Sequence, residues 1–351
     1  MIPQLYTADA VGRPMTRIGG IHQATRCEVV QEVNGAWTLE LEAPTGCDHF
    51  ARIAQGNVIE ARVDPNRERV EDFLIKTVSR SLTGRAVTVQ AEHISYHYNN
   101  IMLAPFLNGG TRRSAQWAWD AWKSAAINNV QAQQLYRATI SATGAPHVLT
   151  PISARAYMME QLLPVYGGEL YWSGLNVDWM DSIGQNRGAK IVYASNMVSC
   201  DVDYEDQGII TAIYPFYGSQ GDENRPFVQL TERILDIGIA APFQNVIPVD
   251  LSSEFEETPT EAQLRTAAQA WIAANRQSIL PPSITVEAVD LPGGIPIFTG
   301  DTVNIYFQAF GISEGRKVQS TTFDVLRERT ISITAGAKRQ TFVRTILDLV
   351  R

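Results

Sequence analysis

Cysteine is scarce in this sequence, and long apolar runs do not occur in it. The three cysteines, Cys27, Cys47 and Cys200, are too few and odd in number for a disulfide-stapled secreted domain, so we expect reduced, buried thiols. No stretch approaches the about 18 uninterrupted apolar residues that a membrane-spanning helix needs, and no basic region followed by an apolar run opens the chain. We therefore expect a protein made in the cytoplasm without a membrane span.

Positive charge is also in short supply. Lys and Arg number 29 against 37 Asp and Glu, a net charge of −8, whereas general affinity for nucleic-acid phosphates needs the opposite sign. Charged residues make up 19% of the chain and hydrophobic residues 45%, which excludes a disordered polyelectrolyte. Because 351 residues exceed what one hydrophobic core usually organises, we expect two or more domains.

Motifs of catalysis and of cofactor binding are missing as well. Gly109–Gly110 and Gly167–Gly168 lack the spacing and the lysine of a phosphate-binding loop. His93 and His97 are four residues apart, but they follow a strand and lack the glutamate that would activate a zinc-bound water. Cys47–His49 groups three reactive residue types in one loop, where adjacency does not make a catalytic dyad. We predict no catalytic residue, metal site or cofactor.

Residues 1–105 have the pattern of a small antiparallel barrel. Asn34–Gly35, between apolar runs at 29–30 and 37–41, predicts a hairpin with a type I′ turn. Further strands are expected at 58–63, 73–78 and 86–91, because apolar and polar residues alternate there as in a half-buried sheet.

After Pro105 the apolar residues no longer alternate with a period of two but recur at helical spacing. One helical stripe consists of Ala115, Trp119, Trp122 and Ala126. We interpret its tryptophans as packing anchors, with an aromatic ligand platform as the alternative. A short helix from Ser153 to Pro164 and strands up to Met197 complete an α/β region at 106–198.

A third helix is predicted at 262–277. Thr258, Pro259 and Glu261 supply an N-cap hydroxyl, a proline at the first helical position and a returning carboxylate. Strands at 209–216 and 226–230 precede this helix, and a strand at 283–289 follows it.

The strongest sequence evidence for the domain organisation is an internal repeat. At an offset of 244 residues, Ile59, Ala61 and Val63 align with Val303, Ile305 and Phe307, and the run 87–91 aligns with 331–335. The agreement holds without gaps, which predicts two copies of one barrel, the second interrupted by an excursion. Chance similarity between two alternating strand patterns is the alternative.

Charge is uneven along the chain. Residues 312–351 carry eight basic and four acidic side chains, so the rest of the chain is strongly acidic, and opposite patches suit head-to-tail contact between identical subunits. The candidate basic residues of such a subunit interface are Arg327, Arg329, Lys338 and Arg339. Asp201, Asp203 and Glu205 share one strand face, where they either line a pore or protect a sheet edge from pairing.

Several stretches resemble the tail hub family of bacteriophages, also called tail-associated protein, minor structural protein or prophage endopeptidase tail protein. The resemblance is carried by Gly167–Leu170, Asp178, Gly184–Gly188, Ile191–Met197, Gln90–Tyr96 and Gly300–Val303. It implies a homotrimer of four-domain subunits, related to the baseplate hub of contractile-tailed phages and to the N-terminal part of secretion-system spikes.

The implied fold class is mixed β and α+β, with two similar β-barrel domains and two α/β insertions. The expected domains are a first barrel at 1–105, an α/β domain at 106–198, a second barrel from 199–239 and 296–351, and a small α/β insertion at 240–295.

The implied role is structural, at the virion tail tip. Three subunits would form a pseudo-sixfold ring that caps the tail tube, holds the tape measure protein and passes DNA without binding it specifically. Expected partners are the distal tail or tail tube protein, the tape measure protein, and receptor-binding or fibre proteins. Many relatives continue into a lytic domain, whereas this chain ends at Arg351, so we expect no lytic activity. The alternatives are a peptidoglycan hydrolase and a tail-tip carbohydrate-binding module, for which seven tryptophans and twelve tyrosines supply rings that stack on sugars.

Overall fold

The computed structural model contains two compact units, one built on Met1–Cys200 with Val286–Ala335 and the other on Asp201–Thr285. The structure describes residues 2–66, 69–81, 83–106, 112–128, 136–144, 146, 148–203, 210–221, 225–238, 244–255, 257–279, 283–288, 294–308 and 312–336.

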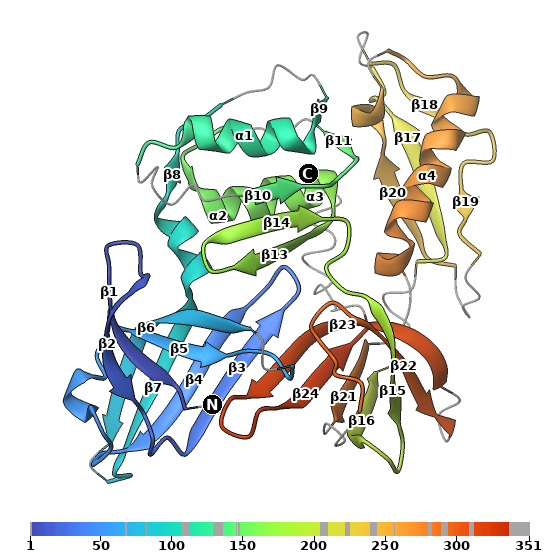
Figure 1. Cartoon of the computed structure of the whole chain (residues 1–351). Helices are drawn as coiled ribbons and strands as arrows, with labels where there is room; N and C mark the ends of the chain where they lie inside the picture. The colour runs from blue at the N-terminus through green and yellow to red at the C-terminus, as the bar shows by residue number, and fades with distance from the viewer. Residues whose placement is uncertain are drawn as a thin grey trace. The chain divides into compact units, whose positions relative to one another are not determined.

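A sheet in the order β2-β1-β5-β6-β7-β4-β3 begins the first unit (Figure 1). Its strands are β1 (Gln4–Ala8), β2 (Pro14–Gly20), β3 (Arg26–Glu32), β4 (Trp37–Pro44), β5 (Val58–Arg62), β6 (Val70–Ser81) and β7 (Ala86–His93). Two 3-10 helices, η1 (Phe50–Arg52) and η2 (Ile94–Asn100), lie between and after them. The predicted strands at 58–63, 73–78 and 86–91 are present, and Ile59 and Ala61 are fully buried as their alternation requires.

The predicted hairpin between β3 and β4 exists, but its turn is not the predicted type I′. Pairing ends at Gln31 and Trp37, so the loop is longer than two residues, and only Asn34 is left-handed, at φ 52°. The Asn34 side chain explains the difference, because it accepts a hydrogen bond from Leu170 N at 2.9 Å and donates to Gly168 O at 2.9 Å. A contact distant in sequence has therefore selected the turn.

An α/β region follows within the same unit. Its elements are β8 (Met102–Leu103), β9 (Arg113–Ser114), α1 (Ala115–Ala125), β10 (Tyr136–Ala138), β11 (Thr143–Gly144), β12 (Ile152–Ser153), α2 (Ala154–Tyr157), the π-turn η4 (Met158–Leu162), α3 (Leu163–Tyr166), β13 (Glu169–Ser173) and β14 (Asn176–Met180). Trp119 and Trp122 on α1 are each 1% exposed, which confirms that the tryptophan stripe packs in the core.

The sequence predicted a helix from Ser153 to Pro164, but the helix continues beyond this proline. Ser153 caps it by accepting a hydrogen bond from Ala156 N at 3.1 Å. The helical segments then run through the π-turn and continue to Tyr166, where Gly167 has φ 71°. A proline clashes with the carbonyl four residues earlier in a regular helix, and the wider π-turn just before Pro164 relieves that clash.

A second set of strands completes the first unit. It comprises β15 (Asn186–Val192), β16 (Met197–Asp203), β21 (Ser283–Ala288), β22 (Thr302–Phe307), β23 (Ile312–Asp324) and β24 (Arg329–Ala335). The long strand β23 pairs with β22 along its first half and with β24 along its second half. β15, which follows the α/β region, runs parallel to β22.

β23 also pairs with β3, from Ser320 opposite Glu32 to Asp324 opposite Glu28. The early strands and the late strands of the chain therefore belong to one continuous sheet. In Figure 1 the blue β3 and the red β23 belong to this one sheet.

The backbone of β22, β23 and β24 repeats that of β5, β6 and β7. Gly56 N donates to Ile75 O at 3.0 Å and Gly300 N donates to Val318 O at 2.8 Å, while the two glycines have φ 85° and 91°. Ile75 and Val318 then each donate to the residue that follows its glycine, at 2.8 and 2.7 Å. The glycine corner is thus repeated, but Gly56 and Gly300 are 244 residues apart whereas Ile75 and Val318 are 243 apart, so the predicted alignment without gaps is wrong in β6 and β23.

The hairpin loops repeat as well. β6 and β7 pair up to Ser81 and Ala86, and β23 and β24 pair up to Asp324 and Arg329. The last loop residues, Arg85 and Glu328, are both left-handed, with φ 48° and 53°. These loops correspond at an offset of 243 residues, one less than the offset of β5 and β22, so one residue has been lost between the copies.

The second unit is a small sheet with a helix packed across one face (Figure 1). It contains β17 (Ala212–Tyr217), β18 (Val228–Gln229), β19 (Leu235–Asp236), β20 (Val246–Asp250), the 3-10 helix η6 (Ser252–Glu254) and α4 (Glu261–Ile279). β17 pairs with β18, β19 and β20. Residues 212–236, which we expected in the second barrel, therefore share a sheet with β20 of the expected insertion.

The N-cap of α4 differs from the predicted one by two residues. Thr260 accepts a hydrogen bond from Gln263 N at 3.4 Å, and the Gln263 side chain returns to accept from Thr260 N at 2.8 Å. Glu261 instead accepts from Thr231 N at 2.9 Å and Thr231 Oγ1 at 2.8 Å. Thr-x-x-Gln and Thr-x-x-Glu both satisfy the capping-box rule. Because Glu261 is engaged by Thr231, the box is formed by Thr260 and Gln263.

The two repeated glycines provide a matched test of this corner. A Cβ at Gly56 meets nothing within 4 Å, whereas a Cβ at Gly300 would lie 2.5 Å from Ile183 Cγ1. We predict that Gly56→Ala lowers the free energy of unfolding by about 1 kcal/mol through its positive φ alone, and that Gly300→Ala lowers it further. Urea denaturation of both variants measures the difference; equal losses would show that the Ile183 contact is unimportant.

Candidate functional site

A buried polar network lies where β6 and β7 meet the α/β region. Glu71 and His93 are 4% and 0% exposed, and His93 Nε2 is 3.1 Å from Glu71 Oε2. Arg69 Nε donates to Glu71 Oε1 at 2.7 Å, and Gly174 N donates to Glu71 Oε2 at 2.8 Å. Strand alternation places Glu71 on the core face of β6, so these partners neutralise a charge that would otherwise be buried alone.

The partners of His93 define its protonation. Ser95 N donates to His93 Nδ1 at 3.2 Å, so the ring proton is on Nε2 and is donated to Glu71. Burial lowers the pKa of His93, and Glu71 opposes this only in part. Burial alone raises the pKa of Glu71, but the His93 hydrogen bond and the Arg69 charge outweigh it and leave this pKa below its usual value. The network is therefore a neutral histidine beside an ionised carboxylate.

Aromatic rings enclose this network. The Trp37 ring stacks on His93 with 3.6 Å between centroids and 16° between planes. The Arg69 guanidinium lies 4.9 Å from the Trp37 centroid and 4.6 Å from that of Tyr171. Trp37 belongs to β4 and Tyr171 to β13, so the arginine is held between a ring of the large sheet and a ring of the α/β region.

Arg155 makes a second connection between these two regions. Its guanidinium lies 4.0 Å from the centroid of Tyr96 and 5.8 Å from that of Trp172, and Nη2 donates to Gly35 O at 3.3 Å. Burial lowers the pKa of Arg155. Stacking on aromatic faces thus partly replaces water around a cation that is 9% exposed.

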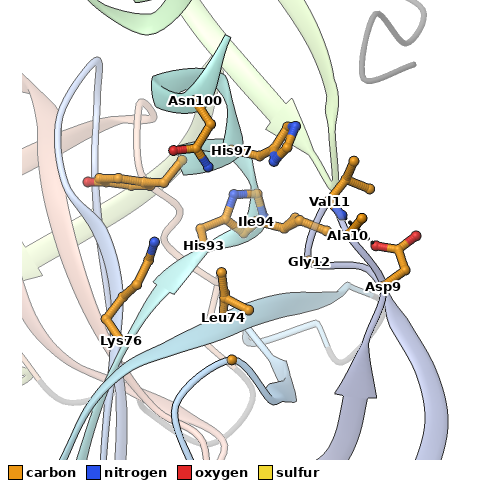
Figure 2. A pocket seen from close by; sticks show the side chains of 12 residues that line it. Asp9, Ala10, Val11, Gly12, Leu74, Lys76, His93, Ile94, His97 and Asn100 are labelled. Carbon is orange, nitrogen blue, oxygen red and sulfur yellow. Dashed lines mark hydrogen bonds between the residues drawn. The ribbon is translucent and has the colours of Figure 1, made fainter. Parts of the chain in front are cut away.

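A cavity of about 200 Å³ adjoins this network (Figure 2). It lies between the β1–β2 turn, β6 and η2, and Figure 2 shows Asp9, Leu74, His93 and His97 around it. The Asp9 carboxylate already accepts hydrogen bonds from the backbone of the turn it closes, and His93 uses both ring nitrogens. Asp9 and His93 are therefore already engaged in hydrogen bonds within the fold. In the part of the chain that the structure describes, no three acidic, histidine or cysteine side chains form a metal-binding group.

Sequence reasoning missed a pair of carboxylates on β5 and β6. Glu60 and Asp72 lie directly opposite each other in the pairing of these strands. Burial, followed by the charges of Glu60 and Glu71, raises the pKa of Asp72 to about 7. Each residue is an ordinary outward position of an alternating strand, and only the register of β5 on β6 brings the two charges together.

The predicted site residues are only partly described. Arg327 ion-pairs with Asp324 at 3.3 Å, and its side chain is 70% exposed. Arg329 begins β24, and its buried Nε has no hydrogen-bond partner among the described residues. Asp201 and Asp203 belong to β16, but their side chains lie outside the described part, as do Glu205, Lys338 and Arg339 entirely. The lumen and interface assignments therefore stay predictions.

Two of the three cysteines are as expected. Cys27 and Cys47 are free and buried, and burial raises the pKa of both thiols. The side chain of Cys200 lies outside the described residues. Among the described helices, none is both long and apolar enough to cross a membrane.

The fold is that of prophage tail proteins. A prophage tail protein gp18 from Listeria monocytogenes EGD-e matches at a TM-score of 0.63 and 12% identity, over 100% of this chain and 98% of that one. The 43 kDa tail protein of prophage MuSo2 from Shewanella oneidensis matches at 0.58 and 13%, over 95% and 98%. A tail protein from Neisseria meningitidis MC58 matches at 0.58 and 9%, over 96% of each chain. No protein-family model and no curated sequence matches the chain. These likenesses confirm the tail-protein resemblance at the level of the fold.

The His93 network makes stability depend on pH. Because the folded-state pKa of His93 lies below the usual value of about 6.5, the unfolded chain takes up this proton first as the pH falls. We predict that the contribution of His93 to the free energy of unfolding is fully present above that value and is lost on acidification. His93→Gln should remove this contribution and leave those of His97, whose pKa burial also lowers, and of Asp72, which has the opposite sign. Urea titrations between pH 8 and 5 measure it. The exposed control His22→Gln should behave as the wild type, and an unchanged slope in His93→Gln would contradict the assignment.

Asp72 should have the opposite pH dependence. Its folded pKa of about 7 lies above the usual Asp value of about 3.9, so its contribution is complete only below that lower value and is lost as the pH rises to and through 7. At pH 8 we predict that Asp72→Asn raises the free energy of unfolding by about 1 kcal/mol, a value discounted for partial exposure. This stabilisation should shrink as the pH falls and vanish below the usual Asp pKa of about 3.9. Asp48→Asn is the exposed control, and a loss of stability in Asp72→Asn at pH 8 would refute the carboxylate repulsion.

Proposed function

We propose that the chain is a structural hub protein of a phage tail, acting at the tail tip or baseplate. The likeness of its fold to three prophage tail proteins over nearly the full length of each chain supports this role. The proposed hub caps the tail tube, holds the end of the tape measure protein and opens to let DNA pass.

The observation that carries the proposal is the structural repeat. β5, β6 and β7 share their glycine corner and their four-residue hairpin loop with β22, β23 and β24. In the proposal these are the centres of two similar barrels in one subunit. Three subunits then place six similar units around one axis, which suits attachment to a sixfold tail tube.

The domain division is part of the same proposal. The first barrel is 1–105, the α/β domain begins at 106, and the second barrel contains 296–351 together with β15, which we expected in the α/β domain at 106–198. The sheet of β17 to β20 with α4 is then a separate domain.

Subunit contacts in the proposed ring are electrostatic at their rim. Arg327 is exposed next to its Asp324 partner and is available to a neighbouring subunit. We propose that Arg329, Lys338 and Arg339 contribute to the same basic interface. The opposite, acidic face of the neighbouring subunit, or else the lumen wall, is proposed to consist of Asp201, Asp203 and Glu205. An acidic lumen leaves the passing DNA unbound, since no counterions are released by contact with it.

Native mass spectrometry of the full chain tests the proposal. We expect a species of three times the 38.8 kDa subunit mass, and averaged electron micrographs with six similar lobes around a central opening. Arg327→Glu should shift the assembly towards monomers at low salt, whereas Arg13→Glu, at an exposed pair with Asp9, should not. A protein that is monomeric at all concentrations tested would overturn the trimer.

A further inference from the structure

The sheet of the second unit buries only one of its two faces among the described residues. On β17, Ile213 and Tyr217 are 0% and 2% exposed and join the core with Leu264 of α4. Alternation along the strand points Tyr214 and Phe216 to the opposite face, where both are only half-buried.

Three aromatic side chains form a row on this outer face. The Phe216 ring lies 6.2 Å from that of Tyr214 and 6.0 Å from that of Phe227, with 31° between the planes in both pairs. We call Tyr214, Phe216 and Phe227 the aromatic row. On the buried face, by contrast, Tyr217 and Phe255 meet edge to face at 78°. The rings of the row therefore turn their faces in similar directions, and Phe227 is 38% exposed.

Hydrogen-bonding groups border the row on both sides. Gln229 lies opposite Phe216 on β18, and Asp250 lies opposite Phe216 on β20. The Gln229 amide is oriented by the hydroxyl of Tyr214, which donates to its Oε1. Asp250 is held by Ser252, whose N and Oγ donate to Oδ1 at 2.9 and 2.5 Å. The polar groups are thus fixed at both edges of an apolar strip.

The charge of this face restricts what can bind to it. None of the residues in β17, β18, β19 and β20 is basic, while Asp236 and Asp250 are exposed on them. Asp236 and Asp250 would repel phosphates and acidic polysaccharides along the strands themselves, while Arg225 and Arg233 lie in the loops before β18 and β19. A protein partner covering the row would bury the Asp250 carboxylate, whose hydrogen bonds from Ser252 supply no opposite charge, and a buried charge without a counter-charge is unfavourable. A polyhydroxylated neutral ligand is not repelled by these carboxylates, and its hydroxyls can donate hydrogen bonds to Asp250 where it is covered.

We propose that the outer face of this sheet binds an uncharged glycan. The apolar C–H faces of successive sugar rings lie on the aromatic row, and sugar hydroxyls donate to Asp250 and to Gln229. All residues of this site belong to the second unit.

Titration calorimetry and saturation-transfer NMR of the full chain test this site. The probes are chitohexaose, cellohexaose and maltoheptaose, with heparin hexasaccharide as the acidic control. We expect binding of at least one neutral probe and none of heparin. Phe227→Ala and Asp250→Asn should each weaken that binding at least tenfold without changing the thermal melting of the chain.

Tyr193→Ala is the matched control. Tyr193 is an aromatic residue of the first unit that is 61% exposed and stacked on Phe307, so its removal should leave glycan affinity unchanged. Failure of all three neutral probes to bind, or wild-type affinity in Phe227→Ala, would overturn the proposal. A change of oligomeric mass in Phe227→Ala without loss of glycan binding would identify the face as a subunit interface instead.

Discussion

The pairing of β3 with β23 is the constraint on which the rest of the first unit depends. It joins strands nearly 300 residues apart in sequence into one hydrogen-bonded ladder, from Ser320 opposite Glu32 to Asp324 opposite Glu28. Backbone bonds extend it at both ends, since Val33 N donates to Gln319 O at 2.8 Å and Val325 N to Cys27 O at 2.8 Å. A largely buried ion pair at 2.7 Å between Arg62 of β5 and Glu328, in the loop before β24, adds a side-chain contact between the two copies. Because register errors in a ladder move every side chain to the wrong face, this pairing fixes the two repeat copies relative to each other as one rigid sheet.

The aromatic and polar network around Glu71 has the same effect between the barrel strands and the α/β region. A buried carboxylate is tolerated only with several donors, and here the donors come from both sides: His93 and Arg69 from the barrel strands, and Gly174 from the α/β region. Separating the two regions would leave the Glu71 charge short of partners in an apolar setting. The network therefore favours one arrangement of the two regions over the alternatives, which an apolar interface of the same size would specify less well.

The strands β5, β6 and β7 and the tryptophan helix were predictable because they depend on local periodicity, and the repeat was recognisable because its copies share that pattern. Ile59, Ala61 and their repeat partners alternate with a period of two, and Trp119 and Trp122 recur at helical spacing. The errors occurred where a distant contact overrides local preference. Asn34 is held by Gly168 and Leu170 instead of forming a type I′ turn, and Thr231 binds Glu261, so that Gln263 completes the cap of α4. The Glu60–Asp72 pair and the His93–Glu71 pair depend on strand register, which no local pattern contains.

The two repeat copies agree in backbone and differ in side chains, and this difference has consequences for any ring built from them. Glu60 opposite Asp72 in the first copy corresponds to Asn304 opposite Gly315 in the second. Arg85 and Glu328 occupy the same left-handed loop position with opposite charges. In the proposed trimer, the backbone would therefore repeat six times around the axis while these charges repeat three times. A sixfold partner must recognise the strand and loop geometry that the copies share, whereas a threefold partner can use the charges that distinguish them. The duplicated barrel would thus connect two symmetries without requiring either partner to change its own.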